Sequence, residues 1–240
     1  LTDILSEKEG YSWPWEKFNQ FLGPLPAATH GLVFGRVEIG KTALITNISL
    51  HMLREGAIVV HFNNEDPIGK LMERYYMINY GVRKELIFKN LEKASIKFEE
   101  EYGENLFIYD TAGLSLAKIH QIVHKHKADL VLIDQLDPMS NELDPSSLEN
   151  LYKGIRNIGK TEETRIISVT QASHGENDWL GMSDVHNSKV GKQAALDYMI
   201  GMGGNPYVPL KRYMSIPKNK LTGSHESFIL QFEPETMRIK

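Results

Sequence analysis

The sequence predicts an α/β fold in which a mostly parallel central sheet is flanked by helices and continues into an antiparallel hairpin at its C-terminal end. Three observations support this prediction. Short β-rich runs alternate with helix-like segments along most of the chain, which is the pattern of a parallel sheet with crossover helices. A glycine-rich loop separates the first apolar run from the first long helix. The last two β-rich runs flank a short turn, as the strands of a hairpin do.

The composition is that of one globular domain. The chain has 240 residues, of which 41% are hydrophobic, and this is enough for a sizeable core. We assign residues 31–240 to the domain and residues 1–30 to an N-terminal linker or docking segment. Trp13 and Trp15 in this segment either pack within the domain or dock on a neighbouring subunit. The chain begins at Leu1 rather than at Met, so we expect an upstream part.

The net charge and the absence of cysteine indicate which binding partners and which cellular compartment to expect. The net charge of −4 argues against a surface that is basic throughout, although a local positive stripe is compatible with nucleic-acid binding. There is no cysteine, which fits a reducing, intracellular compartment. No apolar run has the length of a membrane span and no signal-peptide pattern opens the chain, so we expect a soluble protein without a membrane partner.

The glycine-rich loop follows the pattern G-x-x-x-x-G-K-T and has the chemistry of a phosphate-binding loop. Gly35 and Gly40 allow positive φ, so that several N–H groups can face a polyphosphate at the start of the next helix. Lys41 is long enough to reach the β- and γ-phosphates, and the Thr42 hydroxyl is placed to bind Mg²⁺. The residues expected to hold the nucleotide are Gly35, Arg36, Val37, Glu38, Ile39, Gly40, Lys41, Thr42 and Ala43.

A second β-rich run, residues 57–62, follows the first helix and ends in turn residues. We expect this strand to lie next to the strand that precedes the phosphate loop. Because ligands bind at the carboxyl ends of parallel strands, Glu65 is a candidate general base for the water that attacks a γ-phosphate. Asp66 is better explained as the cap of a helix that begins near Pro67.

Residues 68–104 are expected to be helical, because apolar residues recur at helical spacing. The acidic residues between positions 85 and 104 fit a solvated helix face. The buried face is expected to carry Leu71, Tyr75, Ile78, Leu86, Leu91, Ile96 and Phe98.

A strand over residues 106–110 and a helix over residues 115–127 come next. The helix carries His120 and His124 four residues apart, a spacing that a metal ion could use. Neither a third ligand nor an H-E-x-x-H pattern accompanies them, so we do not assign them to a metal site.

Four apolar residues, 130–133, are followed by Asp134. A continuous apolar run is typical of a parallel strand that is buried on both faces. Its carboxyl end should lie beside the phosphate loop, and we expect Asp134 to hold Mg²⁺ together with Thr42. The alternative is a carboxylate that only caps the end of the strand.

The same alternation continues to the end of the chain. A helix over residues 146–163 leads into a strand over residues 165–171, which ends in Gln171. Its amide can hydrogen-bond a γ-phosphate and signal the loss of that group to the next segment. That segment, residues 172–188, is a polar loop of a length typical of functional loops. A helix over 189–197 and strands over 198–202, 211–217 and 227–232 follow, with a turn over 218–223 between the last two strands.

In this order and spacing, the pieces resemble the RecA-like motor domain of the hexameric replicative helicases, the DnaB-like and phage primase-helicase group. The resemblance runs from about Trp13 to the end of the chain. It rests on the loop from Gly35 to Thr42, on Glu65, Asp134 and Gln171, and on the segments 183–188 and 218–223.

The resemblance implies a RecA-like P-loop NTPase that uses ATP and Mg²⁺ and assembles with copies of itself into a ring, by analogy a hexamer. It implies that Glu65 activates the attacking water and that Lys41 and Thr42 hold phosphate and metal. Asp134 would complete the metal site, and Gln171 would link the γ-phosphate to the DNA loops.

The family also has a basic turn near its C-terminus that reaches into the ATP site of the adjacent subunit. On this sequence that role falls to Lys218 and Lys220. The chain departs from the family here, because Lys220 stands where the family usually has an arginine. Lysine keeps the positive charge but loses the bidentate fork.

The segment from Ala172 to Lys192 resembles the central-channel loop with which this family tracks single-stranded DNA. Asn187, Ser188, Lys189 and Lys192 are the expected contacts to the DNA backbone. Few positive charges lie here, but a ring would multiply them, because each subunit could contribute one set of phosphate contacts.

We therefore expect an ATP-dependent DNA helicase motor that translocates on single-stranded DNA and unwinds duplex during replication. The resemblance places it in the cytoplasm of a bacterium or a phage-infected cell, with a primase domain or protein as a further partner. Two alternatives stay open. One is a RecA/KaiC-like ATPase that serves as a recombination or regulatory assembly switch and does not unwind duplex. The other is a kinase-like P-loop enzyme, although no arginine-rich lid is evident.

Overall fold

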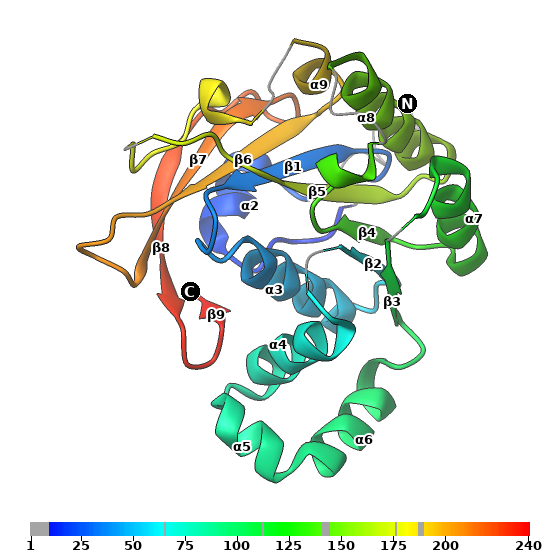
Figure 1. Ribbon diagram of the computed structural model, residues 1–240, viewed down its shortest axis with the longest axis vertical. Helices are drawn as coiled ribbons and strands as arrows, with labels where there is room; N and C mark the ends of the chain where they lie inside the picture. The colour runs from blue at the N-terminus through cyan, green and yellow to red at the C-terminus, as the bar shows by residue number, and fades with distance from the viewer. Residues whose placement is uncertain (1–9, 65, 112, 141–144, 176, 187–189) are drawn as a thin grey trace.

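The computed structural model describes residues 10–64, 66–111, 113–140, 145–175, 177–186 and 190–240. Within these residues, one twisted sheet forms the centre of the molecule and helices lie on both of its faces (Figure 1). The strand order is β3-β2-β4-β5-β1-β6-β7-β8-β9. The predicted α/β class and mostly parallel sheet are therefore confirmed.

The strands from β3 to β6 in this order run parallel, and they match the β-rich runs of the sequence. Most of their residues are buried, as expected for strands covered on both faces. Their bounds are β1 (His30–Gly35), β2 (Val59–Asn63), β3 (Leu106–Asp110), β4 (Leu130–Ile133), β5 (Arg165–Gln171) and β6 (Tyr198–Gly203).

The expectation that β2 lies next to β1 is wrong. β1 pairs with β5 and β6, whereas β2 pairs with β3 and β4. Two strands, β4 and β5, thus separate β2 from the phosphate loop. The apolar strand β4 gains more from a position inside the sheet than at its edge, where its backbone groups would be unpaired. Glu65 follows β2 in the sequence, and β2 pairs with β4, the strand that Asp134 follows.

The antiparallel part of the sheet is larger than the predicted hairpin. β7 (Lys211–Asn219) pairs with β6 and with β8 (Ser227–Glu233), and β9 (Arg238–Ile239) pairs with β8. The predicted hairpin corresponds to β7 and β8, and its strand β7 extends through Asn219. Lys218 therefore belongs to a strand, and Lys220 lies in the turn beyond it.

Helices cover the sheet in two layers with separate apolar clusters. The cluster on one side includes residues of α2 (Glu16–Leu22), α3 (Lys41–Arg54) and α4 (Ile68–Tyr80). The cluster on the other side includes residues of α7 (Leu116–His126) and α8 (Pro145–Thr161). Within one strand, successive side chains enter different clusters: Val33 faces the α3 side, and Leu32 and Phe34 face the α8 side. This alternation follows from the period of two in a strand.

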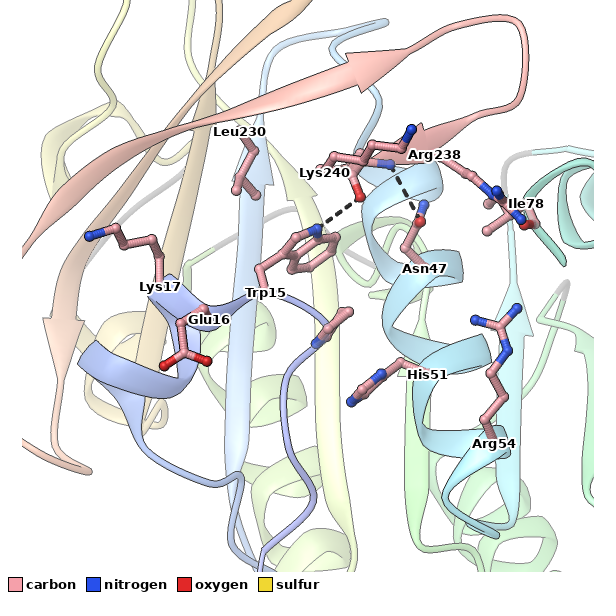
Figure 2. A pocket seen from close by; sticks show the side chains of 12 residues that line it. Trp15, Glu16, Lys17, Asn47, His51, Arg54, Ile78, Leu230, Arg238 and Lys240 are labelled. Carbon is pink, nitrogen blue, oxygen red and sulfur yellow. Dashed lines mark hydrogen bonds between the residues drawn. The ribbon is translucent and has the colours of Figure 1, made fainter. Parts of the chain in front are cut away.

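The tryptophans of the predicted docking segment pack within the domain. Trp13 and Trp15 are 1% and 6% exposed and belong to the cluster on the α3 side. The Trp15 Nε1–H donates to the Ile239 carbonyl oxygen at 2.9 Å, beside a cavity of about 500 Å³ between α2, α3 and β9 (Figure 2). Arg54 and Arg238 line this cavity and bond to α4, at the Asn79 Oδ1 and the Ile78 carbonyl oxygen. Residues around this cavity thus connect both ends of the described chain to α3 and α4.

The predicted helical stretch 68–104 contains α4, α5 (Lys84–Lys89) and α6 (Leu91–Tyr102), with breaks at Gly81 and Asn90. Leu71, Tyr75, Ile78 and Phe98 are buried as expected. Leu86, Leu91 and Ile96 are 49%, 43% and 54% exposed, so their predicted burial is wrong. α5 and α6 extend away from the sheet below α4, which leaves most of their surface without a covering layer (Figure 1). None of the described helices is both long enough and apolar enough to cross a membrane.

Candidate nucleotide site

The phosphate loop connects the end of β1 to the start of α3, as the sequence predicts. Gly35 ends the strand where β6 approaches closely, since a Cβ there would lie 2.6 Å from the Met202 carbonyl oxygen. Gly40 has φ +100° immediately before the helix. Both glycines are thus required by the backbone, one for a close approach and the other for a left-handed conformation. The N–H groups of the first helical turn have no partner within the helix and are available to an anion.

Lys41 and Thr42 lie on the first turn of α3. The Lys41 Nζ donates to the Arg36 carbonyl oxygen at 2.9 Å, so the side chain crosses the loop. The Thr42 Oγ1 donates to the Asp134 Oδ2 at 2.7 Å. Asp134 is fully buried just beyond β4, and its own N–H donates to the Phe62 carbonyl oxygen on β2. Two residues that are 92 positions apart in the sequence thus form one oxygen pair at the same edge of the sheet.

The donor set fits a nucleotide with a magnesium ion. A hydroxyl oxygen and a carboxylate oxygen in contact are the ligand types that Mg²⁺ prefers. Within the described residues, the Arg36 Nε and Nη2 are buried without a hydrogen-bond partner, which places unsatisfied positive donors beside the phosphate loop. A buried donor without a partner is costly, and an anionic ligand could satisfy it.

Glu65, the candidate general base, lies outside the described residues. The preceding Asn64 donates from its Nδ2 to the Gln135 carbonyl oxygen at 3.3 Å, so this end of β2 contacts the segment that follows Asp134. Asp66, on the other side of Glu65, forms ion pairs with Lys70 and Arg74 at 2.9 and 2.6 Å.

Those two ion pairs also change the interpretation of Asp66. Burial alone would raise the pKa of Asp66, but the hydrogen bonds from Lys70 and Arg74 outweigh that effect and lower it. The predicted cap is wrong, because Pro67 occupies the N-cap position of α4 and no side chain caps the helix there. Asp66 instead pairs with side chains one and two turns into the helix.

Gln171 lies at the carboxyl end of β5, beside the phosphate loop. Its register partner is Gly35, and the N–H of the next residue, Ala172, donates to the Gly35 carbonyl oxygen at 2.9 Å. The Gln171 side chain is exposed at this edge. The carbonyl oxygen of Gln171 accepts from the N–H of His186, which closes the base of the polar loop. Gln171 thus lies both beside the phosphate loop and at the start of the polar loop.

Lys192 is buried, and its expected contact with DNA does not fit this structure. Its side chain is 2% exposed, and its Nζ lies 2.9 and 2.8 Å from the two carboxylate oxygens of Asp137. Asp137 also accepts from the Tyr152 hydroxyl at 2.8 Å and from the Thr170 hydroxyl at 2.6 Å. Burial lowers the pKa of Lys192, while Asp137 acts in the opposite direction. We therefore assign Lys192 to an internal ion pair that joins α9 (Val190–Ala194) to β5 and α8.

The remaining predicted DNA contacts, Asn187, Ser188 and Lys189, lie outside the described residues. Two features are seen in the described part of the polar loop: Ala172 and Val185 form an antiparallel bridge, and a short 3-10 helix, η2, spans Met182–Asp184. This pairing brings the two ends of the loop together at the carboxyl edge of the sheet.

Lys218 and Lys220 approach the end of α9. The Lys218 Nζ donates to the Gln193 carbonyl oxygen, and the Lys220 Nζ donates to the Ala194 carbonyl oxygen at 3.5 Å. The end of a helix attracts cations, because its last carbonyl groups point outward. Burial, together with the neighbouring Lys220 charge, lowers the pKa of Lys218 to about 8.

The sequence analysis did not identify two buried residues, one near the polar loop and the other beside the phosphate loop. Asp137, at the start of a 3-10 helix, η1 (Asp137–Met139), is the centre of the network around Lys192. Arg212 on β7 donates from its Nε to the Ile39 carbonyl oxygen of the phosphate loop at 2.7 Å. Neither residue belongs to a motif, and only the contacts of the folded chain identify them. His120 and His124 both contact Glu162 and, within the described part of the chain, belong to no group that could hold a metal ion.

Comparisons with known proteins agree with this geometry. No curated protein matches the chain in sequence. The fold is similar to a solved structure described as the ATPase domain of G40P, with a TM-score of 0.85 at 16% identity, over 99% of this chain and 94% of that chain. It is also similar to a DnaB-like replicative helicase solved in a study of its interactions with primase, with a TM-score of 0.86 at 15% identity. The match covers 99% of this chain but only 65% of that helicase.

A family model adds a match in sequence. The model of the DnaB-like helicase C-terminal domain matches residues 13–200, which include the phosphate loop, Asp134 and Gln171. The fold is thus the RecA-like fold of helicase ATPase domains, and the chain belongs to the family of DnaB-like helicase C-terminal domains.

Proposed function

We propose that this chain is the ATP-hydrolysing motor of a ring-shaped replicative helicase, which moves along single-stranded DNA and unwinds the duplex ahead of it. The observation that supports this proposal most directly is the contact between the Thr42 hydroxyl and the Asp134 carboxylate beside a phosphate loop. Membership in the DnaB-like family makes a helicase motor the activity that fits this site.

The residues of the site have different roles in the proposed phosphoryl transfer. The N–H groups between Gly40 and Thr42, together with the Lys41 ammonium, bind and orient the phosphates. Thr42 and Asp134 hold Mg²⁺, which when bound neutralises charge on the phosphate oxygens. Glu65 accepts a proton from the attacking water, and Gln171 bonds the γ-phosphate and transmits its loss to the loop that begins at Ala172.

The phosphate loop is open on its outer side, where a neighbouring subunit could complete the site. Val37 at the tip of the loop is 61% exposed, although it is apolar. In the proposed ring, Lys218 and Lys220 of one subunit approach the nucleotide of the next and stabilise the charge that develops during hydrolysis. Because both are lysines, they act as point charges and do not form a bidentate contact.

The DNA contacts in the proposal come from Asn187, Ser188 and Lys189, which would bind the strand through its phosphates. Such contacts give affinity without sequence preference and weaken with salt. A primase as partner, a ring of six subunits and a place among the cytoplasmic replication proteins of a bacterium or phage also belong to this proposal.

The test is the rate of ATP hydrolysis with and without single-stranded DNA, measured together with the mass of the assembly in the presence of nucleotide. We expect a DNA-stimulated rate in the assembled protein and none in Lys41→Ala. Lys240→Ala is the matched control, because Lys240 is exposed and, among the residues that the structure describes, its ion pair is with Glu233 alone. Retained hydrolysis in Lys41→Ala would refute the site.

A forked duplex separates the motor from an assembly switch. We expect unwinding that requires a free single-stranded tail. Filament formation or strand exchange without unwinding would favour the RecA/KaiC-like alternative. Hydrolysis that responds to a small acceptor molecule but not to DNA would favour the kinase-like one.

A further inference from the structure

We propose that Arg212 is a positioning residue for the phosphate loop of its own subunit, because it fixes the peptide between Ile39 and Gly40 in the orientation that binds phosphate. The inference rests on the proposed function, in which this loop holds ATP. Arg212 lies far from the loop in sequence, on the antiparallel strand β7.

The guanidinium of Arg212 is buried against the loop. The side chain is 7% exposed, its Nε donates to the Ile39 carbonyl oxygen at 2.7 Å, and its Nη1 donates to the Pro209 carbonyl oxygen at 2.6 Å. Its Cζ lies 4.4 Å from the centre of the Phe232 ring on β8. These contacts with β7, the Phe232 ring and the turn at Pro209 hold the guanidinium in one position. The single Nε–H is used by the hydrogen bond to the phosphate loop.

The contact with Ile39 determines where the next N–H points. A peptide unit is planar and trans, so the carbonyl of Ile39 and the N–H of Gly40 point in opposite directions. When the carbonyl points at Arg212, the Gly40 N–H points away from β7. Gly40 also has φ +100°, a conformation that leaves the loop without the support of a regular helix at this residue. A donor on the Ile39 carbonyl therefore orients one of the amides expected to bind phosphate.

The charge of Arg212 supports the same conclusion. Burial lowers the pKa of Arg212, and no described acidic residue acts in the opposite direction. The positive charge is therefore balanced only by carbonyl dipoles and by the face of Phe232. A polyphosphate in the loop would supply the missing negative charge. Gly40 is also close to the guanidinium, since a Cβ on Gly40 would lie 3.9 Å from the Arg212 Nε.

Arg165 is a matched control that the chain itself offers. It is 8% exposed, its Nε donates to the Leu25 carbonyl oxygen at 2.8 Å, and its Cζ lies 4.7 Å from the centre of the Tyr11 ring. Burial lowers the pKa of Arg165 as well, although Asp129 acts in the opposite direction there. The two arginines thus make the same kinds of contact, but Arg165 begins β5 and lies at the opposite end of the strands from the phosphate loop.

The experiment compares Arg212→Met, Arg212→Lys and Arg165→Met with the unchanged chain. Binding of a fluorescent ATP analogue with Mg²⁺ is measured by anisotropy, and urea unfolding is followed by circular dichroism. We expect both methionine variants to lose stability, and only Arg212→Met to bind the analogue about tenfold more weakly or worse, as for the loss of one charge-assisted hydrogen bond. Arg212→Lys keeps the charge, so its affinity for the analogue should lie between those of Arg212→Met and the unchanged chain. We expect a higher KM for ATP and an unchanged kcat in this variant.

Equal effects of Arg212→Met and Arg165→Met on nucleotide affinity would overturn the inference, because the contact would then be one of packing alone. If Arg212→Met does not fold, Arg212→Lys decides: affinity and KM equal to those of the unchanged chain would also overturn it. Absence of binding in the unchanged chain would instead refute the proposed function, and the inference with it.

Discussion

Replacing Lys192 by methionine tests whether this lysine is an internal partner of Asp137 or a contact to DNA. Asp137 accepts four hydrogen bonds, two from Lys192 and one each from Tyr152 and Thr170. Lys192→Met removes two of these bonds and the only described cation paired with this carboxylate.

The magnitude follows from what remains around the carboxylate. Breaking a buried ion pair from one side costs about 3–5 kcal/mol, because a buried charge is left uncompensated. The hydroxyl groups of Tyr152 and Thr170 still donate to Asp137, so we expect the lower end, about 3 kcal/mol. Adding Asp137→Asn should recover at least about 1 kcal/mol, since the double variant leaves no buried charge.

The assay is urea unfolding with an unchanged m-value, so that the midpoint reports stability. Lys240→Met is the control, because its ion pair with Glu233 is exposed and a solvent-exposed pair contributes little to stability. The reasoning is refuted if Lys192→Met unfolds at the same urea concentration as Lys240→Met. If it then also bound single-stranded DNA more weakly, Lys192 would return to the DNA contacts that the sequence predicts.

Three further predictions concern hydrolysis and pH. Glu65→Gln should bind ATP but not hydrolyse it, and normal turnover in a coupled phosphate-release assay would exclude Glu65 as the base. Burial lowers the pKa of His30 and His61 to about 3, so the unfolded chain takes up protons near pH 6.5 and the folded chain does not. The free energy of unfolding should therefore fall by about 2 kcal/mol per histidine between pH 7 and pH 5. Equal urea midpoints at both pH values would contradict this. Because the pKa of Lys218 is about 8, kcat/KM for ATP in the assembled protein should fall as the pH rises through 8, and Lys218→Arg should abolish the fall; an identical profile in that variant would remove Lys218 from the active site.

The local pattern of the sequence predicts much of the geometry of the candidate nucleotide site. The phosphate loop needs glycine at Gly35 and Gly40 for reasons of backbone geometry, so its motif carries the structure with it. The strand before Asp134 is apolar throughout because it is buried on both faces. These properties depend on neighbours in the chain or on burial in general, and both leave a mark on the residue types.

Properties that depend on one particular distant neighbour leave no such mark. The order of strands that separates β2 from β1, and the burial of Lys192 against Asp137, each follow from the whole fold. A lysine in a polar loop has the same appearance in sequence whether it meets water, DNA or a carboxylate. The apolar residues Leu86 and Ile96 show the opposite case, since helical spacing predicts a buried face but α5 and α6 have no sheet above them.

The position of the five-residue helix α9 has a consequence for the coupling of ATP sites in neighbouring subunits. On one side its Lys192 is joined to Asp137, three residues beyond Asp134, and on the other side its last carbonyl groups accept from Lys218 and Lys220. In the proposed ring, the first contact leads to a subunit's own ATP and the second to the ATP of its neighbour. A shift of α9 by the length of one hydrogen bond would therefore disturb both at once.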